Sequence, residues 1–324
     1  MPLDPLREPL EFQPLPMERV WGGRCLETLL GKPLPPHSES PSIGELWELV
    51  DRPEAQSVVF RGPLKGKTLH ELWQSHRREI FGSRHEANPA ERFPLLFKLL
   101  DARDRLSVQV HPPAEIAVPP LTEPKTECWY FLHAAQGAEV YAGLRSGITR
   151  RDFETALSKG TVEQTLHRIP VHDGESLFLP SGRLHAIGAG LVIVEVQQNS
   201  DTTYRVFDWN RTGLNGKPRP LHVEESLESI DFTDIEPGGT PASEPVIADC
   251  PFFRVEKKTF SSTWSVSLPD DFRVITCVEG TVRCGPTELR PGGFLLTPAS
   301  SRELLLEPQT PLCSVLVTSL PPVS

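Results

Sequence analysis

The sequence predicts a mainly β protein, and three observations lead to this prediction. The chain of 324 residues contains 34 prolines and 23 glycines, a composition that favours turns and short elements over long helices. The stretch LSVQVHPP, residues 106–113, alternates apolar and polar side chains with the period of two that is typical of a strand. Segments rich in β-branched residues and bounded by glycine or proline recur as far as the C-terminus.

The N-terminal third combines short strands with a helical insertion. Residues 1–60 are predicted to form turns and short strands punctuated by proline, as in KPLPPHSESP. Apolar residues then recur at three- and four-residue spacing in TLHELWQSHRREIFG, residues 68–82, and in NPAERFPLLFKLLDARD, residues 88–104. We therefore expect a helical segment near residues 68–104, just before the strand that contains LSVQVHPP.

Strands return after this segment and continue to a linker. Residues 127–144 indicate two strands joined near Gly137, and Thr149 with Asp152 forms a capping pattern for a short helix. Further strands are expected between ESLFLP and LVIVEVQQ. The segment EPGGTPASEP has the composition of a linker, so we place one domain at residues 1–240 and a second at 241–324.

A weak internal repeat links the two predicted domains. When Pro180 in DGESLFLPSGRLH is aligned with Pro298 in PGGFLLTPASSRE, Gly174 falls on Gly292 and His185 falls on Glu303. The second segment keeps the strand and turn frame without the histidine, which predicts a second, related barrel that has no equivalent metal site. Chance similarity between two strands bounded by glycine and proline is the alternative.

Charge and targeting signals exclude some classes of function. The formal net charge of -10 and the pI of about 5.5 provide no basic surface for nucleic acid. The N-terminus has no basic stretch followed by an apolar run, and no window approaches the length of a membrane span. The six cysteines are scattered without a CxxC pair, so neither a disulfide scaffold nor a thiolate zinc site is indicated. We expect a soluble, cytoplasmic protein with no membrane or nucleic-acid partner.

The polar face of LSVQVHPP is the first candidate site. Ser107, Gln109 and His111 share one face of an extended chain, and three apolar residues share the other face. An ordinary half-exposed strand has the same pattern, so the alternation alone leaves both interpretations open.

Two stretches resemble the signatures of the cupin barrels. Residues 174–185, GESLFLPSGRLH, have the second signature's spacing of glycine, five residues, proline, one residue, glycine, two residues and histidine, which places the histidine at His185. Ala189 stands where that signature has asparagine. The first signature is matched loosely, because Gln109 takes the place of its first histidine and Glu127 follows His111 at a long interval.

These departures are themselves informative. QVHP, KTECWY and LHAIGAGLVIVEVQQNSDTTYRVFDWNR resemble the mannose-6-phosphate isomerases in their shorter bacterial form, and VWGG, GELWEL and GITRRDFETAL fit the same family. The resemblance extends from about residue 10 to the C-terminus and is densest between residues 105 and 211. It implies a jelly-roll-like cupin catalytic domain at 1–240 with a helical insertion, and a smaller cupin-like β domain at 241–324.

The resemblance also implies a metal site. It assigns His111, Glu127 and His185 as zinc ligands, with Gln109 as the fourth, and one Zn²⁺ per chain. Two imidazoles, a carboxylate and an amide oxygen suit Zn²⁺ and also accept Mn²⁺, Fe²⁺ or Co²⁺.

Four further residues are expected to act on or contact the substrate. The resemblance places Arg205 in the active site, where a guanidinium stabilises negative charge and contacts substrate oxygens. Lys125 lies two residues before Glu127, so its ammonium faces the same cavity, although a solvated lysine is the alternative. Glu195 lies in a strand of β-branched residues, where it is either the partner in a salt bridge or a catalytic acid or base. Ser107 is a candidate substrate contact at the rim.

The expected reaction is the interconversion of mannose 6-phosphate and fructose 6-phosphate through a cis-enediol. Glu195 is the expected proton carrier, with a metal-activated hydroxide as the alternative base. Arg105, Arg183 and Arg211 are weaker candidates for contacts with the phosphate. Two other functions remain open, a sugar-phosphate-binding cupin without turnover and a non-haem iron cupin oxygenase. The substrate partner is a small sugar phosphate, and the sequence leaves open whether the protein is a monomer or a dimer.

Overall fold

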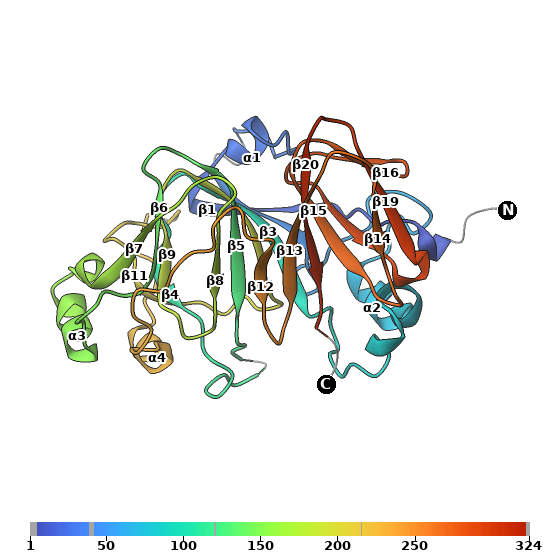
Figure 1. Ribbon diagram of the computed structural model, residues 1–324. Helices are drawn as coiled ribbons and strands as arrows, with labels where there is room; N and C mark the ends of the chain where they lie inside the picture. Colours follow the sequence, from blue (N-terminus) through green and yellow to red (C-terminus); the bar gives the residue numbers. More distant parts are fainter. Residues whose placement is uncertain (1–4, 39–41, 120, 215, 322–324) are drawn as a thin grey trace. The chain divides into compact units, whose positions relative to one another are not determined.

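The computed structural model describes residues 5–38, 42–119, 121–214 and 216–321, and strands dominate it (Figure 1). The first eleven strands are β1 (Leu15–Gly23), β2 (Ile43–Leu49), β3 (Leu95–Ala102), β4 (Val108–Val110), β5 (Glu127–Ala134), β6 (Glu139–Leu144), β7 (Leu166–Pro170), β8 (Ser176–Leu179), β9 (His185–Ile187), β10 (Leu191–Gln198) and β11 (Tyr204–Phe207). The others are β12 (Val246–Asp249), β13 (Arg254–Phe260), β14 (Trp264–Ser267), β15 (Arg273–Glu279), β16 (Val282–Cys284), β17 (Thr287–Leu289), β18 (Phe294–Thr297), β19 (Glu303–Pro308) and β20 (Cys313–Ser319). A mainly β fold is confirmed.

The helices are short. The α-helices are α1 (Cys25–Thr28), α2 (Leu69–Ser75), α3 (Arg150–Ser158) and α4 (Val223–Ser229). A π-helical turn at Arg77–Phe81 follows α2, and 3-10 turns occur at Pro5–Arg7, Ser83–His85, Val162–Thr165 and Ala299–Ser301. None of the helices in the described part of the chain is long and apolar enough to cross a membrane.

The chain divides into two compact units. The first unit contains residues 1–15, 46–98 and 243–324, and the second unit contains residues 16–45 and 99–242. The chain passes from the second unit back to the first between residues 242 and 243, within the linker predicted at 236–245. The predicted domains at 1–240 and 241–324 stay a prediction, and their ends at 1–4 and 322–324 lie outside the described residues.

The same strand order occurs twice. One pair of sheets contains the runs β10-β5-β8 and β4-β9-β6-β7, and the other pair contains β20-β15-β18 and β14-β19-β16-β17. Each strand in the second set is therefore the tenth strand after its counterpart. The alignment of Pro180 with Pro298 also places β8 on β18 and the start of β9 on the start of β19. The internal repeat suggested by the sequence is thus a repeat of structure.

The repeated barrel at β12 to β20 has an aliphatic interior. Its core contains Ile275, Cys277, Leu295 and Val317 among other buried apolar residues. At its counterpart to His185 stands Glu303, which is exposed and bonded to Ser265. Cross-strand register gives the counterpart of Glu127 as well: Glu127 pairs with Leu179 in the first barrel, and Arg273 pairs with Thr297 in the second.

At the start of α2 and of α3, a threonine hydroxyl accepts a hydrogen bond from a backbone N–H group that has no partner within the helix. Thr149 Oγ1 accepts from Asp152 N, and the Asp152 carboxylate accepts from Thr149 N, which confirms the predicted capping box of α3. Thr68 and Glu71 form the same arrangement at α2.

The helical prediction is wrong for the second half of residues 68–104. Residues 95–102 form β3, and all eight of its side chains are buried. The strand is apolar on both faces except for Lys98 and Asp101, and in so apolar a run the residues satisfy the helical spacing by default, so the period carries no information. Burial on both faces is typical of a central strand, and β3 lies inside its sheet between β2 and β10.

Candidate metal centre and active site

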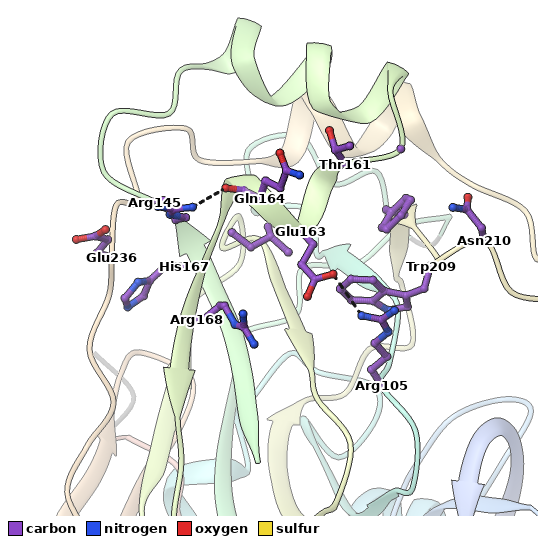
Figure 2. Close-up of a pocket in the computed structure, with 13 residues that line it drawn as sticks. Arg105, Arg145, Thr161, Glu163, Gln164, His167, Arg168, Trp209, Asn210 and Glu236 are labelled. Atoms are coloured by element: carbon purple, nitrogen blue, oxygen red, sulfur yellow. Dashed lines mark hydrogen bonds and ion pairs between the residues drawn. The ribbon is translucent and has the colours of Figure 1, made fainter. Parts of the chain in front are cut away.

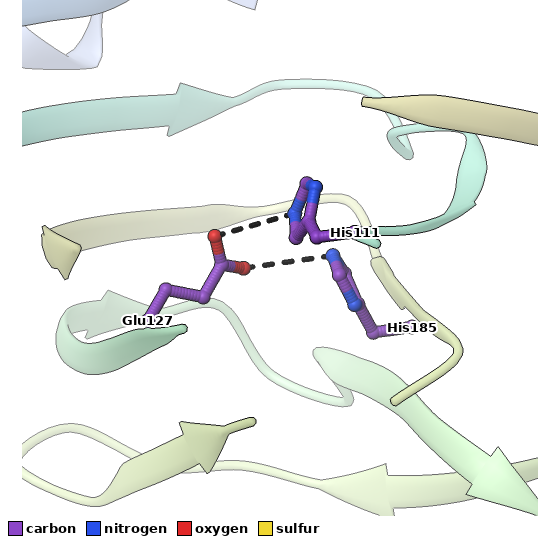
Figure 3. A group of neighbouring side chains, drawn as sticks. All are labelled: His111, Glu127 and His185. Carbon is purple, nitrogen blue, oxygen red and sulfur yellow. Dashed lines mark ion pairs between the residues drawn. The ribbon is translucent and has the colours of Figure 1, made fainter. Parts of the chain in front are cut away.

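Three buried side chains meet inside the barrel of the second unit. His111 follows β4, Glu127 begins β5 and His185 begins β9 (Figure 3). The candidate ligand atoms of these residues all lie within 4.8 Å of one another. The Glu127 carboxylate faces both imidazoles, with Oε2 at 3.4 Å from His111 Nε2 and Oε1 at 3.5 Å from His185 Nε2.

Both imidazoles are held in the tautomer that a metal requires. His111 Nδ1 lies 2.8 Å from the carbonyl of Thr202, and His185 Nδ1 lies 2.9 Å from the carbonyl of Arg183. A carbonyl only accepts, so each Nδ1 donates its hydrogen and each Nε2 keeps its lone pair toward Glu127.

A tight turn fixes the position of His111 relative to the strand that carries His185. Gly182 has a φ of 91°, a conformation that side-chain-bearing residues rarely adopt. Its N–H donates to the carbonyl of His111 at 2.9 Å. The glycine of the signature is therefore needed for the turn.

Gln109 lies beside the three-residue group. It pairs with His185 across β4 and β9, and its Nε2 is 3.2 Å from His185 Nε2. A half-turn of the amide exchanges its nitrogen and oxygen, which brings Oε1 to the side of His185. Ser107 Oγ, 3.4 Å from Gln109 Oε1, then faces the amide nitrogen.

Lys125 is buried beside the same three residues, and the alternative of a solvated lysine is wrong. Its side chain is 5% exposed, and its Nζ is 2.9 Å from Glu127 Oε2. Burial lowers the pKa of Lys125, but Glu127 and then Glu195 outweigh burial and raise that pKa above its ordinary value. The ammonium is therefore a fixed positive charge at the site.

The same charges set the protonation of the candidate ligands. Burial opposes ionisation of Glu127, yet Lys125 and His111 hold its pKa well below the ordinary value. Burial, reinforced by Lys125, lowers the pKa of His111 to about 4. Burial also lowers the pKa of His185. At neutral pH the group is one carboxylate and two neutral imidazoles, which is the ligand form of each side chain.

The residues present fit a divalent metal. His111 Nε2 and Glu127 Oε1 are buried without a hydrogen-bond partner in the described part of the chain. Buried polar atoms are rarely left in this way unless a further group satisfies them. Two nitrogens, a carboxylate and an adjacent amide form a ligand set that suits Zn²⁺.

Arg205 borders the site from β11. It pairs with Gln109, and its Nε donates to Ser107 Oγ at 3.3 Å. Nη1 donates to the carbonyl of Pro220 at 3.0 Å. The guanidinium is thus held beside two of the predicted site residues.

Glu195 connects to the site through Trp129, a residue that the sequence analysis missed. Trp129 Nε1 donates to Glu195 Oε1 at 3.0 Å, and both side chains are buried. The indole edge also contacts the His185 ring, with centroids 5.4 Å apart and planes at 81°. Trp129 lies two residues after Glu127 in a strand, and residues two apart share one face of a sheet. This spacing is the sequence signal that places Trp129 on the same face as Glu127.

The weaker phosphate candidates lie elsewhere. Arg183 forms a two-point ion pair with Asp234 at 2.8 and 2.9 Å, and Arg211 binds Asp208 at 3.0 Å. Arg105 lies 3.8 Å over the Trp209 ring and 3.4 Å from Glu163. In the described residues, these contacts direct the three guanidinium groups to partners other than the metal group, and Arg183 contacts that group only through its backbone carbonyl.

The chain is similar to known proteins of one family. Residues 10–121 match the family described as phosphomannose isomerase type I, catalytic domain. The chain is 37% identical over 315 residues to mannose-6-phosphate isomerase ManA of Bacillus subtilis, covering 93% of this chain and 96% of the relative. It is 36% identical over 305 residues to mannose-6-phosphate isomerase of Streptococcus mutans, covering 90% and 93%. The crystal structure of mannose 6-phosphate isomerase from Bacillus subtilis superimposes with a TM-score of 0.83 at 30% identity, covering 96% of this chain and 99% of that chain.

Proposed function

The chain belongs to the mannose-6-phosphate isomerase family, and from this premise we propose how its residues interconvert mannose 6-phosphate and fructose 6-phosphate. One observation supports the proposal above others: two neutral imidazoles and a carboxylate converge in a buried cavity that also contains a lysine. An aldose–ketose isomerase needs positive charge near the oxygens of C1 and C2 and a base near their hydrogens. The two rival functions, an iron oxygenase and a sensor without turnover, are not favoured by family membership.

The proposed metal ligands are His111, Glu127 and His185, with Gln109 as the fourth through its amide oxygen. We propose one Zn²⁺ per chain. When it is bound, the ion supplies Lewis acidity that polarises the substrate oxygens. The carbonyls of Thr202 and Arg183 keep both imidazoles correctly oriented for this role.

Glu195 is the proposed general base. The open-chain sugar loses a proton from C2 and gains one at C1, and a single carboxylate that reaches both carbons carries the proton across one face of the cis-enediol. The Glu195 side chain is buried, which keeps water from competing for the proton. Trp129 Nε1 donates to one oxygen of this carboxylate at 3.0 Å and so fixes the orientation of the proposed base.

Lys125 and Arg205 are proposed to stabilise the negative charge that develops on the C1 and C2 oxygens. Both cations are held by the protein before substrate arrives, Lys125 by Glu127 and Arg205 by Ser107 and Pro220. Positive charge that is already in place costs no reorganisation during the reaction. Ser107, buried beside Arg205, is the proposed contact for a substrate hydroxyl.

We place the enzyme in the cytoplasm. All six cysteines are free thiols, as is usual for proteins of reducing compartments. The proposed partner is the sugar phosphate itself.

The test is isomerisation of mannose 6-phosphate, measured by a coupled assay on protein treated with chelator and then refilled with Zn²⁺. We expect activity to disappear on stripping and to return on refilling. His111→Gln should abolish both zinc retention and turnover, whereas His172→Gln, at an exposed histidine, should change neither. Absence of turnover with Zn²⁺, Mn²⁺, Fe²⁺ or Co²⁺ in protein with a native circular dichroism spectrum would refute the proposal.

A further inference from the structure

A groove of about 660 Å³ lies in the second unit, away from the metal group (Figure 2). Its floor includes Leu166 and Phe207, which belong to the apolar cluster that also contains Val108 and Ala186. Val108 and Ala186 are the strand neighbours of Gln109 and His185, and adjacent strand residues point to opposite faces of a sheet. The groove therefore lies on the opposite face of the sheet from the metal ligands.

The groove is polar and rich in arginine. Three arginines line it, Arg105, Arg145 and Arg168, together with two carboxylates, Glu163 and Glu236. Glu139, outside the lining, pairs with Arg168. A volume of this size suits a small organic molecule.

The guanidinium groups retain donors for a ligand. Arg145 Nη1 donates to the carbonyl of Gln164 at 3.2 Å. Arg168 binds Glu139 through two nitrogens at 3.0 and 2.5 Å. Each guanidinium has five N–H groups, so these contacts orient both side chains and leave further donors on two residues that line the groove. The planar arrangement of such donors matches the oxygens of a phosphate.

The two ends of the groove differ in chemistry. Figure 2 shows Arg145 at one end, Trp209 and Asn210 at the other, and Arg168 between them. Glu163, toward the second end, is 3.1 Å from the Tyr141 hydroxyl and 3.4 Å from Arg105. A carboxylate and an amide next to cations are suitable partners for hydroxyl groups, which both donate and accept.

We propose that this groove binds the phosphate monoester of a polyol or sugar. The phosphate lies against Arg145 and Arg168, and the hydroxyl groups lie toward Glu163 and Asn210. This site is separate from the catalytic cavity, and its existence does not depend on the proposed mechanism.

The groove also has a direct covalent and hydrogen-bonded link to the active site. Arg105 stacks on Trp209, and Trp209 Nε1 donates to the carbonyl of Leu106 at 2.6 Å. Leu106 precedes Ser107, whose hydroxyl accepts from Arg205. A ligand that draws Arg105 away from Glu163 therefore acts on the segment that leads to the catalytic residues.

The test is calorimetric titration of the zinc-loaded protein with glycerol 1-phosphate, fructose 6-phosphate and inorganic phosphate. The groove variants are Arg145→Gln, which leaves the Arg168–Glu139 pair intact, and the Arg145→Gln/Arg168→Gln double variant. Arg151→Gln changes an exposed arginine of α3 that does not line the groove and is the matched control. Neutral glycerol tests whether the phosphate is required.

We expect at least one of the two monoesters to bind at a site that weakens at least tenfold in Arg145→Gln and is lost in the double variant. Binding should be unchanged in Arg151→Gln, and basal isomerisation should be unchanged in all three variants. If fructose 6-phosphate occupies this second site, the ligand is a substrate or product; if only glycerol 1-phosphate does, it is another polyol phosphate. Equal stoichiometry and affinity in wild type and double variant, for every probe, would overturn the proposal.

Discussion

Trp129 donates its indole hydrogen to Glu195 at 3.0 Å while the edge of the same ring contacts His185. One side chain thus touches a proposed metal ligand and the proposed base. The pairing of β5 with β10, in which Trp129 lies opposite Glu195, brings these groups together. The proposed base is therefore positioned by strand pairing, and four predictions are argued from this site.

Trp129→Phe keeps an aromatic ring against His185 and removes the donor to Glu195. A hydrogen bond to a charged group contributes about 1.5–3 kcal/mol, so kcat should fall roughly tenfold or more. Steady-state kinetics should show an unchanged KM, and zinc content per chain should be unchanged. A rise in KM or loss of zinc, with kcat preserved, would show that the indole acts only in packing.

Glu195→Gln removes the proposed base with almost no change of shape. General-base catalysis contributes about 10²–10⁴-fold, so kcat should fall by that order while zinc content stays at the wild-type level. The matched control is Glu228→Gln, at an exposed position on α4, which should retain full activity. Retention of more than about half the wild-type kcat in Glu195→Gln would assign the base to another group.

Lys125→Met should destabilise chelator-stripped protein more than zinc-loaded protein. Glu127 is buried and its ion pair with Lys125 is 2.9 Å long, and removal of one partner of a buried pair costs about 3–5 kcal/mol. A bound cation compensates the carboxylate, so urea unfolding of the zinc-loaded variant should show a smaller loss.

The exposed pair of Lys67 and Glu71 provides the comparison for this experiment. Lys67→Met should change the free energy of unfolding by less than about 1 kcal/mol in either form. Equal losses for Lys125→Met with and without zinc would mean that Lys125 does not balance the charge of the metal ligands.

Stripped protein should lose stability as the pH falls from 6.5 to 5. Burial, reinforced by Lys125, lowers the pKa of His111 from 6.5 to about 4, so the unfolded chain takes up a proton in this window and the folded chain does not. The free energy of unfolding should therefore decrease by about 2 kcal/mol through His111. His185, whose pKa is lowered by burial, acts in the same direction.

Glu127 does not explain this loss, because its pKa is lowered and its contribution disappears only as the pH falls below its ordinary value of 4.5. Urea unfolding at several pH values, on wild type and His111→Gln, measures the effect. The variant should have a shallower slope between pH 6.5 and pH 5. Identical slopes would show that His111 takes up its proton in the folded state as readily as in the unfolded chain.

The strands with one polar face were predictable from the sequence, and so were most of the residues they place in the site. Gln109 and His111 alternate with valines, and this period of two, followed by proline, predicts a strand. The position of Glu127 was different. A loop of fifteen residues separates it from His111, and no local rule relates two residues across a loop of that length, so only the family resemblance identified it.

The sequence was uninformative where burial was complete or contacts were distant. β3 has no polar face to reveal its period, so it resembled a helix. The partnership of Trp129 with Glu195 depends on a register between strands 66 residues apart. The carbonyls of Thr202 and Arg183, which orient the imidazoles, are backbone groups that every residue possesses, so residue type carries no signal for them.

The repeated strand order allows one half of the molecule to be compared with the other. Glycine, proline and strand register are retained in both barrels, while a histidine in one corresponds to a glutamate in the other and a glutamate to an arginine. The scaffold therefore recurs, and the side chains at the corresponding positions differ. The same architecture thus occurs twice within a single polypeptide, once with the proposed catalytic residues and once with an apolar interior. The residues that form the barrel and the residues that are proposed to act in turnover are therefore separate sets in this chain.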